Sequence, residues 1–261
     1  MIKINETHKI DCAKGLKKLE DSSIDLTVTS PPYDNLRKYN GFDFDFPTIA
    51  SELYRVTKPG GIVVWVVGDA SIKGSETGTS FKQALHFKEV GFNLHDTMIY
   101  EKNSMSMPDS NRYYQKFEYM FVLSKGSPKT FNPIKDRKNI AERWGKKYNI
   151  FDKDGNKIER ERSLEKNEYG VRFNIWKYNT GKGFTDKQNY NHPAKFPIKL
   201  AEDHIISWSN EGDLVLDPFM GSGTTAKAAL VNNRNFIGFE ISKEYCDMSN
   251  ERIKNAQAKL F

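Results

Sequence analysis

Short apolar runs alternate with segments of helical periodicity along most of the chain. Residues 62–68 read IVVWVVG, a continuous apolar run that is typical of a strand buried on both faces of a sheet. Shorter runs predict strands at 24–28, 97–100, 119–123, 214–216 and 236–239. Helices are predicted over 49–56, 81–90, 197–207, 224–231 and 244–259. This alternation predicts an α/β fold with three layers and a mostly parallel sheet.

Charged residues are distributed unevenly along this pattern. The net charge is +6, yet residues 125–190 contain 17 Lys and Arg against 9 Asp and Glu, a surplus of +8, so the rest carries −2. Apolar periodicity is lost in the same stretch. A basic segment on a nearly neutral scaffold favours a polyanionic partner, although a solvated surface insertion is an equally good explanation of the charge. The predicted organisation is 1–125, an insertion at 126–190, and 191–261.

Composition excludes several classes of protein. Hydrophobic residues make up 38% and charged residues 28% of the chain, as in a folded globular protein. No apolar run reaches membrane-spanning length, and the start MIKINETHKI lacks the apolar core of a signal peptide, so a cytoplasmic protein without a membrane span is expected. Cys12 and Cys246 are too few for a disulfide framework and lie in no metal-ligand spacing, so no metal is expected.

A glycine-rich turn follows the predicted strand at 214–216. Residues 213–226 read DLVLDPFMGSGTTA, which places Gly221 and Gly223 between a strand and a helix. Such a turn lets backbone N–H groups approach a nucleotide-like ligand closely. Glu240 closes the next strand, where a carboxylate can accept hydrogen bonds from two ribose hydroxyls. Strand, turn, helix and acidic strand end together predict a nucleotide-type cofactor site.

Other interpretations of this turn remain. A phosphate-binding loop is excluded because no Gly-Lys-Ser/Thr sequence is present. A nicotinamide-dependent oxidoreductase is the serious alternative, but such folds build several strands after their glycine turn, and here only 236–239 follows. A tight turn that needs glycine for packing alone is the structural alternative.

A second motif, TSPPY, occupies residues 29–33 directly after a predicted strand. Ser30 offers a hydroxyl, Pro31 a carbonyl of fixed direction, and Tyr33 a flat aromatic face. These groups suit a planar base with an exocyclic amine. Two acceptors on that amine free its delocalised lone pair, and stacking on Tyr33 would hold the base in line with an electrophile. An ordinary strand-terminating Pro-Pro turn also accounts for the tetrapeptide.

The two motifs in this order resemble the β-class of DNA amino-methyltransferases, a circularly permuted group. In that family S/D/N-P-P-Y/F comes first, a DNA-recognition insertion follows, and D-P-F-x-G-S-G-T-T lies near the C-terminus. Further matches are PGG at 59–61, KFEY through SKG at 116–126, and HPAKFP at 192–197. The resemblance covers nearly everything outside 126–191. It implies a Rossmann-like methyltransferase fold with an inserted target-recognition region, and S-adenosylmethionine as the cofactor.

The resemblance also implies roles for individual residues. Ser30, Pro31, Pro32 and Tyr33 would hold a flipped base as the catalytic group. The cofactor would be bound by Asp11, Cys12, His192, Pro193, Phe196, Asp217, Pro218, Phe219, Gly221, Ser222, Gly223, Thr224, Thr225 and Glu240. The implied reaction uses neither metal nor covalent intermediate, because the amine attacks the sulfonium methyl directly.

Ser30 bears on the identity of the base. Family members with serine here, together with HPAxFP, are more often similar to N4-cytosine enzymes, and those with Asp or Asn to N6-adenine enzymes. We therefore expect cytosine N4. Adenine N6 is the alternative, because a hydroxyl can donate to a ring nitrogen and accept from the amine of either base. C5-cytosine methylation is disfavoured, since neither Cys12 nor Cys246 follows a proline.

Three further functions remain alternatives: a non-catalytic DNA-binding module, an RNA or protein methyltransferase, and the oxidoreductase. The intact motifs argue against the first, and the permuted order argues against the second.

Double-stranded DNA is the expected partner, with a cognate restriction endonuclease as a second one, and the protein is expected to be a monomer or homodimer. Arginine is the usual partner of guanine. The candidate DNA contacts are Arg37, Lys38, Arg137, Lys138, Arg143, Lys146, Lys147, Arg160, Arg162, Arg172 and Lys182. For any single one of them, a solvated charge is the plainer explanation.

Overall fold

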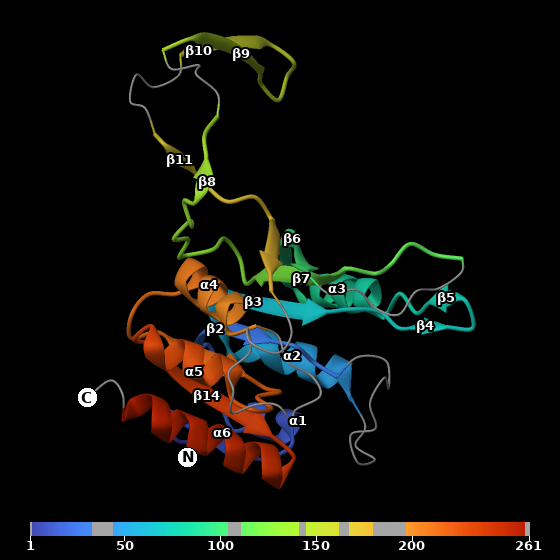
Figure 1. The fold of residues 1–261 in the computed structure, drawn as a ribbon, viewed down its shortest axis with the longest axis vertical. Helices are drawn as coiled ribbons and strands as arrows, with labels where there is room; N and C mark the ends of the chain where they lie inside the picture. Colours follow the sequence, from blue (N-terminus) through green and yellow to red (C-terminus); the bar gives the residue numbers. More distant parts are fainter. Residues whose placement is uncertain are drawn as a thin grey trace. The chain divides into compact units, whose positions relative to one another are not determined.

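A computed structural model of the protein describes residues 2–32, 44–103, 111–140, 145–161, 167–179 and 197–258. The chain divides into two compact units. The larger unit comprises Met1–Asn132 and Asn174–Phe261, and the smaller unit comprises Pro133–Phe173. Figure 1 shows the elements of both, coloured along the sequence.

An eight-stranded sheet forms the centre of the larger unit, in the order β1-β14-β13-β2-β3-β7-β6-β12. The strands, in that order, are β1 (Glu6–Lys9), β14 (Asn235–Glu240), β13 (Leu214–Asp217), β2 (Ile24–Thr29), β3 (Thr57–Val67), β7 (Phe117–Ser124), β6 (Asn93–Lys102) and β12 (Ile175–Tyr178). All neighbouring strands are parallel except β7, which runs antiparallel to β3 and β6. The predicted α/β fold with a mostly parallel sheet is confirmed.

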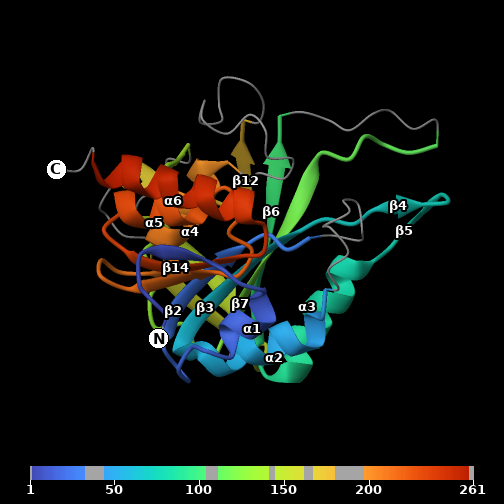
Figure 2. The ribbon, with the colours of Figure 1, turned by 90° about the horizontal axis from the view of Figure 1, so that it is seen from below.

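Helices cover both faces of this sheet and complete the three layers (Figure 2). One layer contains α1 (Cys12–Leu16), α2 (Phe46–Val56) and α3 (Thr79–Val90), and the other α4 (Ile198–Trp208), α5 (Thr224–Val231) and α6 (Lys243–Gln257). Among the described residues, every helix falls short of the length and apolar character that crossing a bilayer requires.

The central strand β3 explains why the sequence here is apolar at every position. Val63, Trp65 and Val67 belong to the core cluster that includes residues of α1, α2 and α3, while the alternate residues of the strand face the opposite layer and are equally buried. Trp65 also satisfies its indole N–H, which donates to Gln83 Oε1 at 2.8 Å. Trp65 is therefore fixed in orientation as well as buried.

The structure extends β3 and adds to the central sheet two strands, β1 and β12, that the sequence did not indicate. β3 begins at Thr57 rather than 62, because Ile24 pairs with Thr57 and Leu26 with Ile62, so that 58–61 form a bulge. β1 was missed because only Thr7 in it is buried. β12 was missed because it lies in the charged stretch, yet it pairs with β6 at the end of the strand order.

Lys125 connects the end of β7 to the end of α2. Its ammonium donates to the carbonyls of Tyr54 at 2.7 Å and Thr57 at 2.9 Å, and it lies 4.6 Å from the centre of the Tyr54 ring. Carbonyls at a helix C-terminus lack intrahelical donors and favour a cation. The SKG sequence at 124–126 thus has a structural role in this protein.

The smaller unit is made of two short antiparallel pairs: β8 (Arg137–Lys138) with β11 (Tyr169–Gly170), and β9 (Lys147–Phe151) with β10 (Lys157–Glu161). None of its described residues is buried. The smaller unit covers fewer residues than the insertion expected at 126–190, because residues 126–132 and β12 belong to the larger unit. That this insertion recognises a DNA target stays a prediction.

Candidate functional site

Three parallel strands end side by side at one edge of the sheet, here called the carboxyl edge: β2 at Thr29, β13 at Asp217 and β14 at Glu240. The pairing of Leu216 with Thr27 brings the start of the SPP segment next to the Asp-Pro-Phe segment. Residues nearly 190 positions apart in the sequence thus meet, as the two motifs predicted.

Asp217 is the group that joins them. One of its carboxylate oxygens accepts a hydrogen bond of 2.6 Å from the Thr29 hydroxyl, and the other accepts one of 2.7 Å from the Thr225 hydroxyl. The Phe219 amide donates to the first oxygen as well, at 3.0 Å. Both motifs and the start of α5 are therefore held by a single side chain, which we call the Asp217 clamp (Asp217, Thr29 and Thr225).

This clamp is buried, since Asp217 exposes only 2% of its surface. Burial raises the pKa of Asp217 from 3.8 to about 6, against the opposing effect of the hydrogen bonds from Thr29 and Thr225, which lower the pKa. These contacts are all within the protein, and the expected contact of Asp217 with a cofactor stays a prediction. The observed contacts make Asp217 a positioning residue.

The glycine turn that follows requires glycine for two separate reasons. Gly221 and Gly223 have φ of 53° and 82°, in the left-handed region that other residues rarely adopt. A Cβ on Gly223 would also lie 2.5 Å from Ser249 Oγ of α6. The turn is closed by the Met220 amide, which donates to the Phe239 carbonyl at 2.9 Å. Its path therefore depends on close approach to both β14 and α6.

Glu240 accepts hydrogen bonds from this turn at the end of β14. Its carboxylate accepts from the amides of Gly221 and Ser242, both at 2.8 Å, and burial raises its pKa. A carboxylate has about four acceptor positions, so two backbone donors leave capacity for ligand hydroxyls. The Ile10 amide donates to the Glu240 carbonyl at 3.0 Å, which places Asp11 next to this strand end.

Asp11 and Cys12 thus lie beside Glu240, although they are far from it in sequence. The Asp11 side chain accepts from the Lys14 amide at 3.0 Å and caps α1. Burial raises the pKa of the half-buried Cys12 thiol to about 12, with Asp11 and Glu240 adding to the shift, so its surroundings disfavour the thiolate.

Two residues of the site were missed from the sequence. Thr29 was identified only as the first residue of the TSPPY motif, with no role of its own. Arg252 of α6 exposes only 5% of its surface. It donates to the Ser222 carbonyl at 3.2 Å and to the Thr224 hydroxyl at 3.3 Å, so it connects α6 to the glycine turn. A signal existed, because Arg252 adjoins Ile253 on the stripe that α6 otherwise buries.

Several predicted residues cannot be placed relative to this edge. Those outside the described residues are Tyr33, Arg37, Lys38, Arg143, Arg162, Lys182, His192, Pro193 and Phe196. Within the described part, Ser30 and Pro32 are half-buried and Pro31 is buried at the end of β2. Pro218, Ser222 and Thr224 are buried with the turn, and Phe219 is half-buried.

The described candidate DNA contacts all lie in the smaller unit. Arg137 donates to the Val171 carbonyl at 3.0 Å and lies 4.8 Å from the centre of the Phe173 ring, while Arg172 forms an ion pair with Asp136. Lys147 pairs with Glu159 at 2.7 Å. Lys138, Lys146 and Arg160 are exposed. The structure thus places these cations in one unit, and their contacts to DNA stay a prediction.

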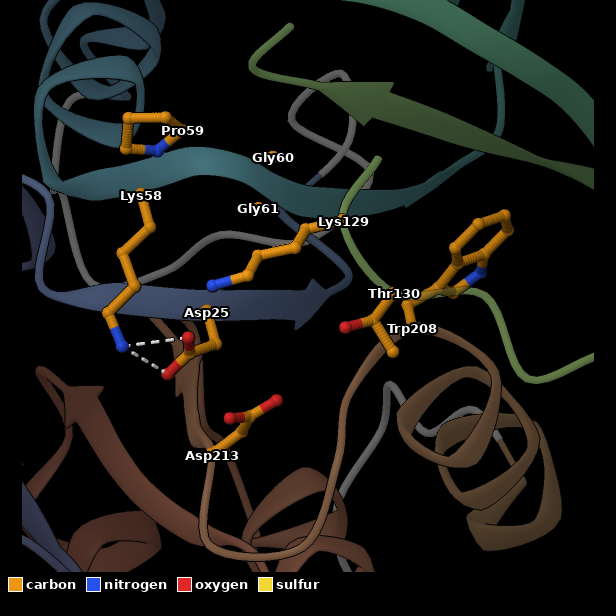
Figure 3. Close-up of a pocket in the computed structure, with 9 residues that line it drawn as sticks. All are labelled: Asp25, Lys58, Pro59, Gly60, Gly61, Lys129, Thr130, Trp208 and Asp213. Atoms are coloured by element: carbon orange, nitrogen blue, oxygen red, sulfur yellow. Dashed lines mark hydrogen bonds and ion pairs between the residues drawn. The ribbon is translucent and has the colours of Figure 1, made fainter. Parts of the chain in front are cut away.

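A pocket of about 210 Å³ lies at the opposite edge of the sheet, where β2 and β13 begin (Figure 3). Asp25 in this pocket accepts two hydrogen bonds of 2.7 Å from Lys58. Gly60 and Gly61 of the β3 bulge and Trp208 of α4 also line it. From the two motifs it includes only Asp213, which precedes β13 at the opposite end of that strand from Asp217, so the pocket is separate from the carboxyl edge.

Comparison of the sequence with known proteins identifies the family to which the chain is similar. The family N6_N4_Mtase, described as DNA methylase, matches residues 24–251. The orphan methyltransferase M.BamHII of Bacillus amyloliquefaciens is 63% identical over 246 residues, which cover 92% of this chain and 92% of that protein. The type II methyltransferase M.HpaI of Haemophilus parainfluenzae is 30% identical, over 92% of this chain and 71% of its own length.

Solved structures agree with this at the level of the fold. The PvuII DNA methyltransferase, described as cytosine-N4-specific, superposes with a TM-score of 0.68 at 22% identity, covering 99% of this chain and 95% of that one. A DNA modification methylase of Thermus thermophilus, solved in complex with S-adenosyl-L-methionine, gives a TM-score of 0.64 at 22% identity, covering 96% of this chain and 95% of that one.

Proposed function

The chain belongs to the N6_N4_Mtase family of DNA methylases, and from that premise we propose that it methylates the N4 amine of cytosine in double-stranded DNA. The coarser activity follows from the family: the protein is an S-adenosylmethionine-dependent DNA methyltransferase that acts on an exocyclic amine. The observation that carries the finer proposal is Ser30, which follows a strand end fixed to the glycine turn by the Asp217 clamp.

The groups at the carboxyl edge suit the binding of S-adenosylmethionine. Glu240 lies half-buried with acceptor capacity left for the ribose hydroxyls, and the glycine turn removes the side chains that would fill the approach to its backbone. Bound S-adenosylmethionine supplies a methyl group on a positively charged sulfur. The residues that would hold it are those of the turn with Glu240 and Asp11, joined by His192, Pro193 and Phe196.

Ser30 and Pro31 would hold the target amine. The ring of Pro31 fixes the direction of its carbonyl, and Thr29, whose hydroxyl is bound by the Asp217 clamp, fixes where β2 ends. Two acceptors on the amine hydrogens would favour a pyramidal nitrogen with a lone pair free to attack. Ser30 and Pro31 would thereby present this lone pair to the methyl group that the cofactor supplies, and the proton that the amine loses would pass to water. Tyr33 would stack on the flipped base.

Cytosine is favoured over adenine because of the residue at position 30. A serine hydroxyl can donate to the ring nitrogen and accept from the amine of either base, so the choice of cytosine rests on the resemblance of serine at this position to N4-cytosine enzymes. Adenine N6 is the second candidate, because its amine chemistry is the same.

We also propose that the order of the motifs reflects a circular permutation, with the cofactor turn following the catalytic segment. The smaller unit would contribute to target recognition.

Methyl transfer to duplex DNA with labelled S-adenosylmethionine, followed by digestion to nucleosides and mass spectrometry, tests the proposal. N4-methylcytosine is expected. N6-methyladenine would refute the choice of base alone, and an absence of label in DNA would refute the activity.

The role of Ser30 has its own test. Ser30→Ala should lower kcat by about 10²-fold, as removal of one hydrogen-bonding group from a transition state does, with the Kd for S-adenosylmethionine unchanged. Ser127→Ala, which alters an exposed serine, is the matched control. Equal kcat values for the two variants would contradict the role.

A further inference from the structure

The β9–β10 hairpin of the smaller unit has two chemically different faces. In this antiparallel pair Tyr148 lies opposite Arg160, and Ile150 lies opposite Ile158. Directly opposed residues share a face and successive residues alternate, so these four side chains form one face, here called the Tyr–Arg face. It carries an aromatic ring, two β-branched side chains and one cation, and no carboxylate.

The other face is charged and internally paired. It carries Lys147, Asn149, Phe151, Lys157, Glu159 and Glu161. Lys147 and Glu159 form an ion pair at 2.7 Å, so cations on this face are balanced by carboxylates. A polyanion would therefore meet less repulsion on the Tyr–Arg face.

The turn of this hairpin is held by its own side chains. Asp152 Oδ1 accepts from the amides of Asp154 at 2.9 Å and Asn156 at 2.7 Å, and the Asn156 side chain donates to Asp152 Oδ2 at 3.1 Å. Gly155 has φ of 82°, which the turn requires. The tip thus has a defined shape without support from a hydrophobic core.

The hairpin nevertheless lacks the burial that would normally stabilise it. Tyr148 and Ile158 are each 38% exposed, and no described residue of the smaller unit is buried. An isolated two-stranded hairpin is marginally stable in water. Tyr148 and Ile158 thus leave apolar surface on the Tyr–Arg face that a partner could cover.

Shape and charge select the partner. Paired strands lie about 4.8 Å apart, so a two-stranded ribbon with its side chains fits the major groove of B-DNA, which is about 12 Å wide. The hairpin as a whole carries four Lys or Arg and four Asp or Glu over 147–161, but Arg160 is the sole charged residue of the Tyr–Arg face, so that face is positively charged. Both properties fit duplex DNA.

We propose that the β9–β10 hairpin enters the major groove of the DNA substrate with its Tyr–Arg face toward the bases, and that Arg160 reads a guanine. This inference rests on the proposed function, because the DNA is that of the methylation reaction. Arg160 donates to the O6 and N7 acceptors of guanine, as arginine does in direct readout. Tyr148 lies across the ribbon from it and limits the positions that the guanidinium can take.

The experiment uses the full chain and starts from the sequence that the unsubstituted protein methylates, found by sequencing plasmid DNA after methylation. Duplexes with each single base pair of that site replaced then give kcat/KM values for the protein and for Arg160→Ala. The variant should lose about 10- to 100-fold in kcat/KM on the intact site, the cost of one bidentate arginine–guanine contact. Its discrimination should vanish at one G·C position and persist elsewhere.

Two further variants separate readout from folding and from general charge. Lys157→Ala removes a cation from the opposite face of the same hairpin and should leave discrimination unchanged. Arg160→Lys should restore part of the lost discrimination. The Kd for S-adenosylmethionine should be the same for all variants.

Two results would overturn the inference while leaving the proposed function intact. Arg160→Ala could lower kcat/KM equally on every duplex, which would make Arg160 a phosphate contact. Lys157→Ala could change discrimination as much as Arg160→Ala does. No methyl transfer by the unsubstituted protein would overturn the proposed function and this inference together.

Discussion

The buried carboxylate of Asp217 makes the stability of the larger unit depend on pH in an unusual direction. Its pKa in the folded protein is about 6, compared with 3.8 for an unperturbed aspartate, a difference of roughly 2 pH units. Each unit corresponds to 1.36 kcal/mol, so the effect amounts to about 3 kcal/mol. Because the folded pKa is the higher one, the folded protein retains a proton that the unfolded chain releases between about pH 4 and 6.

The Asp217→Asn substitution isolates this contribution, because asparagine does not titrate. The free energy of unfolding of the unsubstituted protein, minus that of the variant, should fall by about 3 kcal/mol as the pH rises from 4 to 7, and then stay level. Urea unfolding followed by circular dichroism at pH 4, 5, 6, 7 and 8 measures this difference.

Asp45→Asn is the control with the opposite sign. Hydrogen bonds from Thr48 lower the pKa of Asp45, so its contribution is present above the usual pKa and is lost as the pH falls. An Asp217 difference that is flat between pH 4 and 7, or that rises with pH, would refute the assignment of a raised pKa and with it the account of the clamp.

Two further predictions follow from named contacts. Gly223→Ala should destabilise the protein by about 1 kcal/mol more than Gly212→Ala, because both glycines have φ near 80° but, of the two, only Gly223 has a close neighbour, Ser249 Oγ. Equal losses of stability in thermal unfolding would contradict this. Lys125→Met should lower the free energy of unfolding by about 1–2 kcal/mol, because the carbonyls of Tyr54 and Thr57 lose a charged donor; an unchanged urea midpoint would count against that role.

Elements with a buried side chain at every position or every other position were predictable from the sequence. β3 is apolar throughout because helices cover it on both faces, and that pattern survives in the sequence. β1 has one buried residue, so it left no pattern. The smaller unit buries none of its described side chains, and burial is what imposes periodicity, so its hairpins were not predictable.

The candidate site was predictable as a pair of motifs but not as a set of contacts. The glycines at 221 and 223 indicate a turn with positive φ, because few other residues tolerate that backbone conformation. Whether Asp217 faces a ligand or the protein interior depends on where Thr29 lies, and that is set by the pairing of β2 with β13. Such a pairing is a property of the whole sheet.

The junction of β2 with β13 also dictates when the protein can acquire activity. Thr29 and Asp217 are separated by 188 positions, so ribosomes working at about 5–20 residues per second need roughly 10–40 s between making one and making the other. During that interval one flank of β2 has no partner strand, and an unpaired strand edge is open to pairing with other chains. Translation products that stop before β13 therefore lack Asp217, and the junction between the two motifs cannot form in them.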